Sequence, residues 1–483
     1  MSWLHSFEYE RALAAFERAE KADPRNPMAY WGQAMCYEQL LWGNENVDEA
    51  RAILDRMRRR GALARATEPE RDWLATLAVL FGPGDRVTRL NAYSEAMGTL
   101  DAKYPDDADV AAFRGLALLA TRARGLAGHH PSLGGHGDVP QLAGSVEQEE
   151  AARVFRRILD AHPRHPGALH YLIHVWDDPA NAHKALDAAR VYATVVPESS
   201  HARHMPAHVF VQLGMWNDAI ASDEAAVAAA EAKVTQDGLP VTATDFHPLS
   251  WLVYEYLQAN RFADARRMLE RLRAPAEATR DPRLLSMLAT LRSRVAVEGG
   301  DWSAVPGPDF VNSDELFTVG YSAARRGDAG LAERARTRLA QLATEPRYAE
   351  RRALLDIMAL QVGAAIRALH DDIEGALARS ADATRRERAL PSSIGPPPLI
   401  KPAQEQYGEL LLEHGRPVEA AAQFAGALER ARNRRLALEG LARARTATAE
   451  SSASRRGALA GGGGVVLLLL LLVAARHRRT RPA

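Results

Sequence analysis

Apolar residues in the segment 407–433, YGELLLEHGRPVEAAAQFAGALERARN, recur every three or four positions in two runs separated by Gly415. This spacing places the apolar side chains on one face of each run, which predicts two amphipathic helices joined by a short turn. The segment 11–40, RALAAFERAEKADPRNPMAYWGQAMCYEQL, has the same pattern, with Pro24 between its two runs. Both segments therefore predict helices that pack against each other in pairs.

Helix pairs of this kind recur along the chain at a regular distance. Pro105, Pro163 and Pro197 each end a run of helical pattern, and Pro163 and Pro197 are 34 residues apart. Weaker copies begin near His247 and Asp314. Because each pair can bury its apolar face only against the next pair, this period predicts an α-solenoid, which is an all-α fold.

The residues at fixed places in these pairs resemble the tetratricopeptide repeat (TPR), a 34-residue unit of two helices. In the pair 407–433, small and aromatic residues occupy four defining places of the repeat: Gly408, Ala420, Phe424 and Ala427. The start of the chain has the same pattern at Ala12, Phe16, Ala19 and Pro24. Arg432 departs from it, because the family usually has a proline there. The resemblance implies a right-handed superhelix, in which small residues admit an aromatic ring from a partner helix.

The TPR resemblance also divides the chain. It covers about residues 1–447 and is weaker in three stretches, near 60–100, 275–312 and 346–400. Residues 448–456 predict a linker to an apolar C-terminal segment. We therefore expect one long repeat domain followed by a short tail.

Two segments interrupt the repeats. The segment 125–145 is rich in Gly, Pro and His, which predicts a long loop. We interpret its histidines as solvated, with metal binding as the alternative: His129, His130 and His136. The segment 391–402, PSSIGPPPLIKP, predicts a stiff extended connector that introduces the last repeat.

Composition removes several classes of function. Lys plus Arg equals Asp plus Glu, at 61 each, so nothing indicates electrostatic binding of nucleic acid. The one cysteine, Cys36, excludes an intramolecular disulfide framework and a Cys-rich zinc module. Of 16 histidines, 11 lie between His129 and His208, and this concentration needs a cause.

Two histidine pairs inside this region follow the repeat. His170 and His174 are four residues apart, and His204 and His208 repeat them 34 residues later. Two residues four apart lie on one face of a helix. In TPR proteins, positions 2, 5, 9, 12 and 13 of the first helix line the concave groove. The resemblance therefore implies that eight residues face one groove and are not core residues: His170, His174, His201, His204, His208, His247, Asp177 and Asp178.

The four paired histidines are candidate metal ligands. Neighbouring helices lie about 8–10 Å apart, so imidazoles of His170 and His174 can reach the same ion as those of His204 and His208. Asp223 stands where the repeat prefers a packed aromatic residue, and an inward carboxylate there can orient a ligating histidine. The alternative for this carboxylate is an ion pair with Arg203. Histidine and carboxylate ligands suit Zn, Fe, Ni or Cu, and the sequence does not choose among them.

Two functions stay open for the groove. Most TPR arrays bind extended peptides or helices, so the first is a protein or peptide partner bound in a His-lined groove. The second is a metal-binding protein or a metal-dependent enzyme that uses the same histidines. Histidines with only a structural role are the remaining interpretation. No HExxH, thiolate pair or nucleophile motif accompanies the histidines, so we predict no catalytic residues. Glu405 and Glu409 take groove positions in the last repeat, and we interpret them as solvated.

Three blocks of the sequence resemble a bacterial group of His-rich TPR proteins of unknown chemistry. They are HYLIH (170–174), HMPAHVF (204–210) and GPPPLIKPAQEQYGELLLEHGRP (395–417). The resemblance implies a function centred on the groove and a bacterial source.

The C-terminal tail predicts attachment to a membrane. Residues 457–475 are 19 uncharged residues, about the length that spans a bilayer. Two arginines precede them and four follow in residues 476–483, so the basic bias places the C-terminus in the cytoplasm and the repeats outside. The glycine-rich stretch, apolar run and terminal arginines also resemble bacterial C-terminal sorting tails. We expect the protein to be membrane-attached or sorted through this tail.

The first residues conflict with export. MSWLHSFEYERAL has no apolar core of a signal peptide. Ala12, Phe16 and Ala19 belong to the second helix of a repeat, and without a first helix they are expected to face water. One hypothesis places the true start upstream, with a signal peptide and the missing helix. In the alternative, the first repeat is a half-cap and the repeats stay in the cytoplasm.

Overall fold

The computed structural model describes residues 1–122, 145–304 and 312–452. Their α-helices are α1 (Ser2–His5), α2 (Tyr9–Ala22), α3 (Pro27–Met35), α4 (Val47–Arg59), α5 (Glu68–Leu80), α6 (Arg86–Lys103), α7 (Ala108–Arg122), α8 (Val146–Ala161), α9 (Pro166–Val175), α10 (Leu186–Tyr192), α11 (Ser200–Leu213), α12 (Trp216–Gln236), α13 (His247–Gln258), α14 (Phe262–Thr279), α15 (Pro282–Gly299), α16 (Ser313–Arg325), α17 (Ala329–Leu342), α18 (Arg352–Leu369), α19 (Ile373–Ala389), α20 (Ala403–Glu413) and α21 (Pro417–Arg430). Residues 435–452 are also helical. The two short strands, β1 (Glu38–Gln39) and β2 (Asn44–Glu45), form one antiparallel hairpin.

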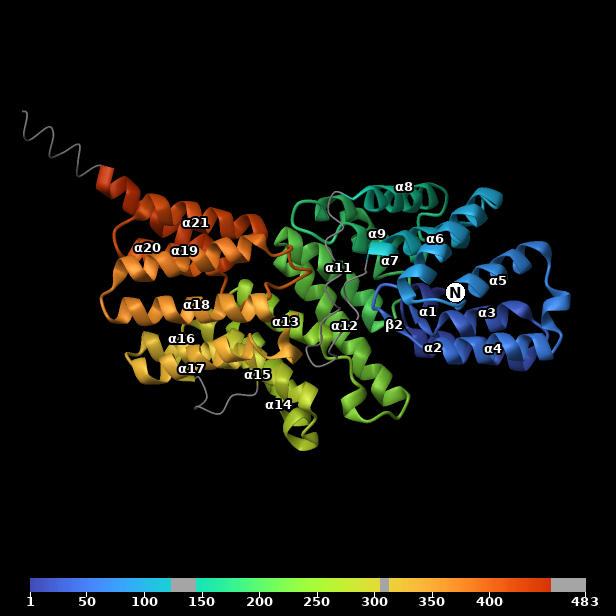
Figure 1. Cartoon of the computed structure of the whole chain (residues 1–483), viewed down its shortest axis with the longest axis horizontal. Coiled ribbons are helices and arrows are strands. Elements are labelled where there is room, and N and C mark those ends of the chain that lie inside the picture. Colours follow the sequence, from blue (N-terminus) through green and yellow to red (C-terminus); the bar gives the residue numbers. More distant parts are fainter. Residues whose placement is uncertain (123–144, 305–311, 453–483) are drawn as a thin grey trace, which may run out of the picture.

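The helices form an elongated array in which most helices pack against the next helix along the chain (Figure 1), while α5 packs mainly against α3 and α6. The blue helices α1–α6 lie at one end of the view and the orange and red helices α16–α21 at the other. Helices α9, α11 and α13 lie in the middle of the array. The predicted all-α helical-repeat solenoid is confirmed.

Aromatic rings packed on glycines join the helix pairs. A Cβ atom added to Gly408 would lie 2.9 Å from the Phe424 ring, and one added to Gly440 would lie 2.3 Å from the same ring. The ring of Phe16 approaches Gly32 in the same way, at 2.2 Å. Any larger residue at these glycines would push the helices apart, which is the physical reason that the repeat keeps small residues there.

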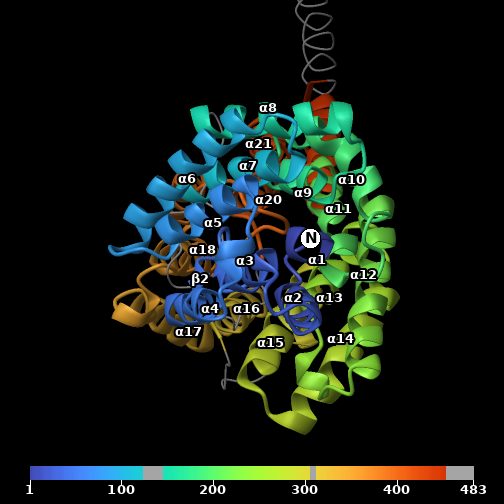
Figure 2. The ribbon, with the colours of Figure 1, turned by 90° about the vertical axis from the view of Figure 1, so that its right-hand side faces the viewer.

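The first helix pair differs from the expectation. Ala12 is 2% exposed, and Phe16 and Ala19 are half-buried, because α2 packs against α1 and α3. The prediction that these residues face water is therefore wrong. Helix α1 also contacts α9, far along the chain, and lies toward the centre of Figure 2, inside the curve of the green helices.

The connector 391–402 also runs into the interior. Leu399 and Ile400 are buried, and Gly395 adopts a left-handed φ of 86° against the Trp251 ring. A Cβ atom at Gly395 would lie 2.1 Å from that ring, so only glycine fits this approach. The connector therefore occupies part of the space inside the superhelix.

A buried ionic network holds the second half of the array together. Glu405 is 0% exposed and accepts hydrogen bonds from Arg434 Nε at 2.7 Å and Lys401 Nζ at 3.1 Å. Arg434 also pairs with Glu298 at 2.6 Å. Burial alone would raise the pKa of the Glu405 carboxyl, but the two cations lower it to about 2. The prediction that Glu405 is solvated is wrong, because Arg434 and Lys401 pair with it inside the array.

Several sequence predictions concern residues outside the described ranges. These residues are 125–144 of the predicted loop 125–145 and 453–456 of the predicted linker 448–456. The whole apolar segment 457–475 and the whole basic tail 476–483 also lie outside the described ranges. Within the described ranges, no helix combines the length and the hydropathy needed to cross a bilayer. The predicted C-terminal hydrophobic helix and its membrane attachment stay predictions.

Candidate functional site

Helix α9 carries the first two histidines. Its N-cap is His165, whose Nδ1 accepts a hydrogen bond from the Ala168 amide at 3.2 Å, and Pro166 opens the first turn. His170 and His174 follow one turn apart on the same face. Gly167 lets α1 approach, because a Cβ atom there would lie 2.4 Å from His5 Nδ1.

Helices α11 and α13 supply the other four histidines. The Ser199 side chain accepts a hydrogen bond from the Ala202 amide and caps α11, so His201 and His204 lie inside its first turns. Pro206 lies within this helix. His247 is the first residue of α13.

The six histidines form two groups of three. In the first triad, which we define as His170, His174 and His201, the Nε2 atom of His170 lies 3.1 Å from Nε2 of His174 and 3.0 Å from Nε2 of His201. The second triad is His204, His208 and His247. In each triad one ligand atom per residue lies within 4.8 Å of the others. The sequence had grouped the histidines by repeat into two pairs, whereas the structure adds one histidine to each pair.

Hydrogen bonds fix the tautomer of His170. Its Nδ1 atom lies 2.6 Å from the backbone oxygen of His5, which can only accept, so Nδ1 carries the proton and Nε2 carries a lone pair. Two other imidazole nitrogens point at this one lone pair. A single in-plane lone pair can accept one linear N–H bond, so the convergence is better suited to a shared cation than to two hydrogen bonds.

The second triad is oriented by carboxylates. His204 Nδ1 donates to Asp223 Oδ1 at 2.6 Å, and His208 Nδ1 donates to Asp177 Oδ2 at 2.5 Å. Both imidazoles therefore present an Nε2 lone pair on the other side of the ring. Asp177 is held in turn by Gln212, whose Nε2 donates to Asp177 Oδ1 at 3.2 Å.

The triads are adjacent and lie under aromatic rings. The ring centroids of His174 and His208, one from each triad, are 6.1 Å apart. The Phe7 ring lies 4.5 Å from that of His170, and the Trp251 ring lies 4.4 Å from that of His208. The Trp42 ring contacts His201 at 5.6 Å.

The predicted open groove is wrong at this place. Each of the six histidines is at most 8% exposed, so they lie in the interior and do not line an open concave surface. Helix α1 and the residues after it cover the first triad with Phe7. The connector 391–402 covers the second triad through the contact of Gly395 with Trp251.

Burial keeps the imidazoles neutral. It lowers the pKa of His174 to about 3 and that of His204 to about 4. The pKa values of His170, His201 and His247 also fall well below 6.5, first through burial and then through the neighbouring histidines. Neutral imidazole is the form that binds a metal ion.

No protein-family model matches the chain, and no curated protein matches it. Among solved structures it is similar to the yeast Tom70, at 11% identity, covering 93% of this chain and 87% of that one, with a TM-score of 0.32. It is also similar to the Cut9–Hcn1 hetero-tetramer of APC/C, at 10% identity, covering 90% of this chain and 93% of that one, with a TM-score of 0.32. A third similar structure is the TPR domain of P58(IPK), at 14% identity, covering 92% of this chain and 94% of that one, with a TM-score of 0.24. These TM-scores are low, so the fold assignment rests on the packing of the chain itself.

The pairing of helices in the chain resembles that of tetratricopeptide-repeat proteins. Its rings on glycines, Phe16 on Gly32 and Phe424 on Gly408, are the contacts that the repeat pattern implies. Within this helical array, Asp177 and Asp223 lie against the histidines. Asp178 does not, because its carboxylate accepts from the amides of Ala180 and Asn181 and closes the turn after α9.

Other groups near the site were not found from the sequence. Glu255 on α13 is 0% exposed and lies beside Asp223, and burial raises the pKa of both carboxyls well above their usual values. His5 supplies the backbone oxygen that orients His170. Neither residue belongs to the period-34 pattern, so the repeat register gave no signal for them.

A third group of candidate ligands lies beside α1 and consists of His5, Asp109 and His165. His5 Nε2 and His165 Nε2 lie 2.8 and 3.1 Å from Asp109 Oδ1. The Nδ1 atom of His165 accepts the Ala168 amide, so Nε2 carries the proton and has no lone pair for a metal ion. This group therefore links α1, α7 and the start of α9 by hydrogen bonds.

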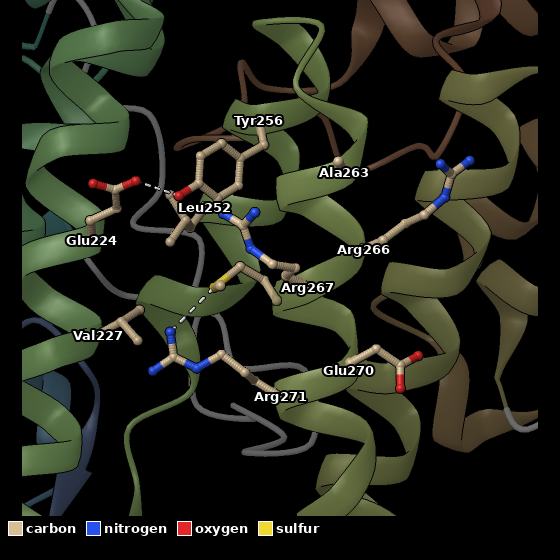
Figure 3. Close-up of a pocket in the computed structure, with 10 residues that line it drawn as sticks. Glu224, Val227, Leu252, Tyr256, Ala263, Arg266, Arg267, Glu270 and Arg271 are labelled. Atoms are coloured by element: carbon tan, nitrogen blue, oxygen red, sulfur yellow. Dashed lines mark hydrogen bonds between the residues drawn. The ribbon is translucent and has the colours of Figure 1, made fainter.

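The depressions on the surface of the described residues lie elsewhere. One of about 880 Å³ opens between α12, α13 and α14 and is lined by Glu224, Val227, Leu252, Tyr256, Ala263, Arg266, Arg267, Met268, Glu270 and Arg271 (Figure 3). The Tyr256 hydroxyl donates to Glu224 at its upper edge. Its lining holds no triad histidine, so the triads are not part of this depression.

Proposed function

We propose that this TPR-like protein binds transition-metal ions at the two adjacent histidine triads. One observation carries the proposal: His170, His204 and His208 each donate through Nδ1 to a fixed oxygen and so present an Nε2 lone pair to their triad. Metal-ligating histidines typically donate their other ring N–H to a carboxylate or a backbone carbonyl, which fixes the tautomer and raises the basicity of the ligand.

The spacing of the first triad supports this function. With a nitrogen–metal distance of about 2.05 Å, ligand nitrogens are separated by about 3.3 Å in tetrahedral and about 3.5 Å in trigonal geometry. The two Nε2 separations that involve His170 are 3.1 and 3.0 Å. The nitrogens of these two pairs therefore need to move apart by only a few tenths of an ångström to hold an ion, and the third pair lies within 4.8 Å.

The burial of the histidines favours metal over a peptide in a His-lined groove. A peptide would have to displace Phe7 of the N-terminal segment and the connector that packs on Trp251. A helical-repeat scaffold is suited to protein–protein interaction, and partner binding is proposed for its other surfaces. Binding of the protein to a membrane through residues 457–475, with the repeats outside a bacterial cytoplasm, is a separate proposal. Fractionation of cells that express the chain with and without this segment tests it.

The test of metal binding is a titration of the chelator-treated protein. The wild-type chain is expected to bind Zn²⁺ or Cu⁺ stoichiometrically, and the His174→Asn, His208→Asn double variant is expected to lose this binding. His183→Asn is the matched control, because His183 is exposed and outside both triads. Circular dichroism shows that each variant is folded. A folded wild-type chain that retains no transition metal at micromolar free ion overturns the proposal.

A further inference from the structure

We propose that the two triads hold a pair of copper ions in the monovalent state, one ion per triad. This inference rests on the proposed metal-binding function and adds the identity, charge and number of the ions. It is carried by the ligand set and by the packing of aromatic rings around the triads.

The ligand set is nitrogen only. Each triad offers three imidazoles, and the nearest carboxylates, Asp177 and Asp223, bind the far sides of the rings rather than the metal position. Imidazole nitrogen suits copper, zinc, iron and nickel ions. Six imidazoles without a directly bound carboxylate also disfavour magnesium, calcium and manganese, which prefer oxygen.

The space around the triads favours an ion with few ligands. Zinc with three protein ligands completes its coordination with water. Here the rings of Phe7, Trp42 and Trp251 pack against the buried histidines. Monovalent copper is stable with three nitrogen ligands and needs no water, so it suits triads that are buried under aromatic rings.

The experiment is an anaerobic titration of the metal-free full-length chain with Cu⁺ against bicinchoninate, and a parallel titration with Zn²⁺ against a chromogenic chelator. We expect two Cu⁺ per chain, an affinity for Cu⁺ at least 100-fold above that for Zn²⁺, and three nitrogen neighbours per copper in X-ray absorption. His247→Asn and His201→Asn, one in each triad, are each expected to leave one Cu⁺ per chain, while His183→Asn keeps two.

The outcomes separate this inference from the proposed function. Tight zinc binding that disappears in the triad variants, with copper no tighter than zinc, overturns the copper assignment and keeps the metal-binding function. One ion shared by all six histidines, seen as a stoichiometry of one that either variant abolishes, overturns the pair. A folded wild-type chain that binds neither ion overturns both proposals.

Discussion

The aspartate behind His208 gives the sharpest test of how the second triad is built. Asp177 accepts from His208 Nδ1 through Oδ2 and from Gln212 Nε2 through Oδ1. Gln212 Nε2 also donates to the backbone oxygen of Ser393 at 2.7 Å, so its amide nitrogen is fixed toward Asp177. In Asp177→Asn one of the two oxygens becomes a donor. If the remaining oxygen keeps the bond from Gln212, the new NH₂ group faces His208 and favours the tautomer whose Nε2 carries a proton.

The expected loss follows from the loss of this acceptor. Removing an outer hydrogen-bond partner of a ligating histidine costs about 10–100-fold in metal affinity. This corresponds to about 1.4–2.7 kcal/mol of binding free energy. The measurement is a competition titration with a chromogenic chelator, using Cu⁺ and Zn²⁺ in separate experiments so that the result does not depend on which ion is native.

The neighbouring aspartate provides the matched control. Asp178→Asn makes the same chemical change one residue away, but Asp178 accepts from the amides of Ala180 and Asn181 and touches no triad histidine. It is expected to bind metal as the wild type does. Equal affinities for the wild type and Asp177→Asn, or an equal loss in both variants, would refute the reasoning that Asp177 acts through His208.

Three further predictions concern the stability and closure of the site. The metal-free protein should lose stability as pH falls below 6.5, because His174 and His204 stay neutral in the folded chain but take up a proton in the unfolded chain. At pH 5 the expected loss in the free energy of unfolding is about 2 kcal/mol for each histidine, and urea unfolding measures it. Phe7→Ala should destabilise the fold by about 3–5 kcal/mol and speed the release of bound metal to a chelator, because the buried ring covers the first triad. Arg434→Met should cost about 3–5 kcal/mol in urea unfolding, because it removes the buried guanidinium that pairs with both Glu298 and Glu405.

Each of these predictions has a control. The pH effect should shrink in His174→Asn, because asparagine does not titrate, and a flat profile between pH 6.5 and 5 in the wild type would contradict it. Val146→Ala, at a residue that is 74% exposed, should leave both stability and metal release unchanged. An Arg434→Met variant as stable as the wild type would show that the network around Glu405 adjusts or takes up protons instead.

The sequence was most informative where contacts follow the repeat. His170, His174, His204 and His208 come together because two helices one period apart present the same face, and the period of 34 could be read directly. The same reasoning placed His201 and His247 on that face. The pairing of rings with small residues, as in Phe424 on Gly408, was also predictable, because it joins residues of one repeat.

The sequence was least informative where segments far apart along the chain meet. The hydrogen bond from His170 to the His5 backbone joins residues 165 positions apart, and that from Gln212 to Ser393 joins residues 181 apart. Local periodicity carries no information on such contacts, since it describes each helix and its neighbour. The covering of the histidines by Phe7 was therefore missed, and the groove was predicted to be open.

The covering of both triads, which the sequence did not predict, has one physical cause. A solenoid of helix pairs leaves a concave surface, and six neutral imidazoles on it would be hydrated unless other parts of the chain fill the space. Here the N-terminal segment brings Phe7 against the first triad, and the connector brings Gly395 against Trp251 beside the second. Covering the imidazoles lowers their pKa values, so they stay in the neutral form that binds a metal ion. Burying these polar rings without a bound cation costs folding free energy. The repeats thus supply the ligands, while non-repeating segments turn an open surface into a closed site.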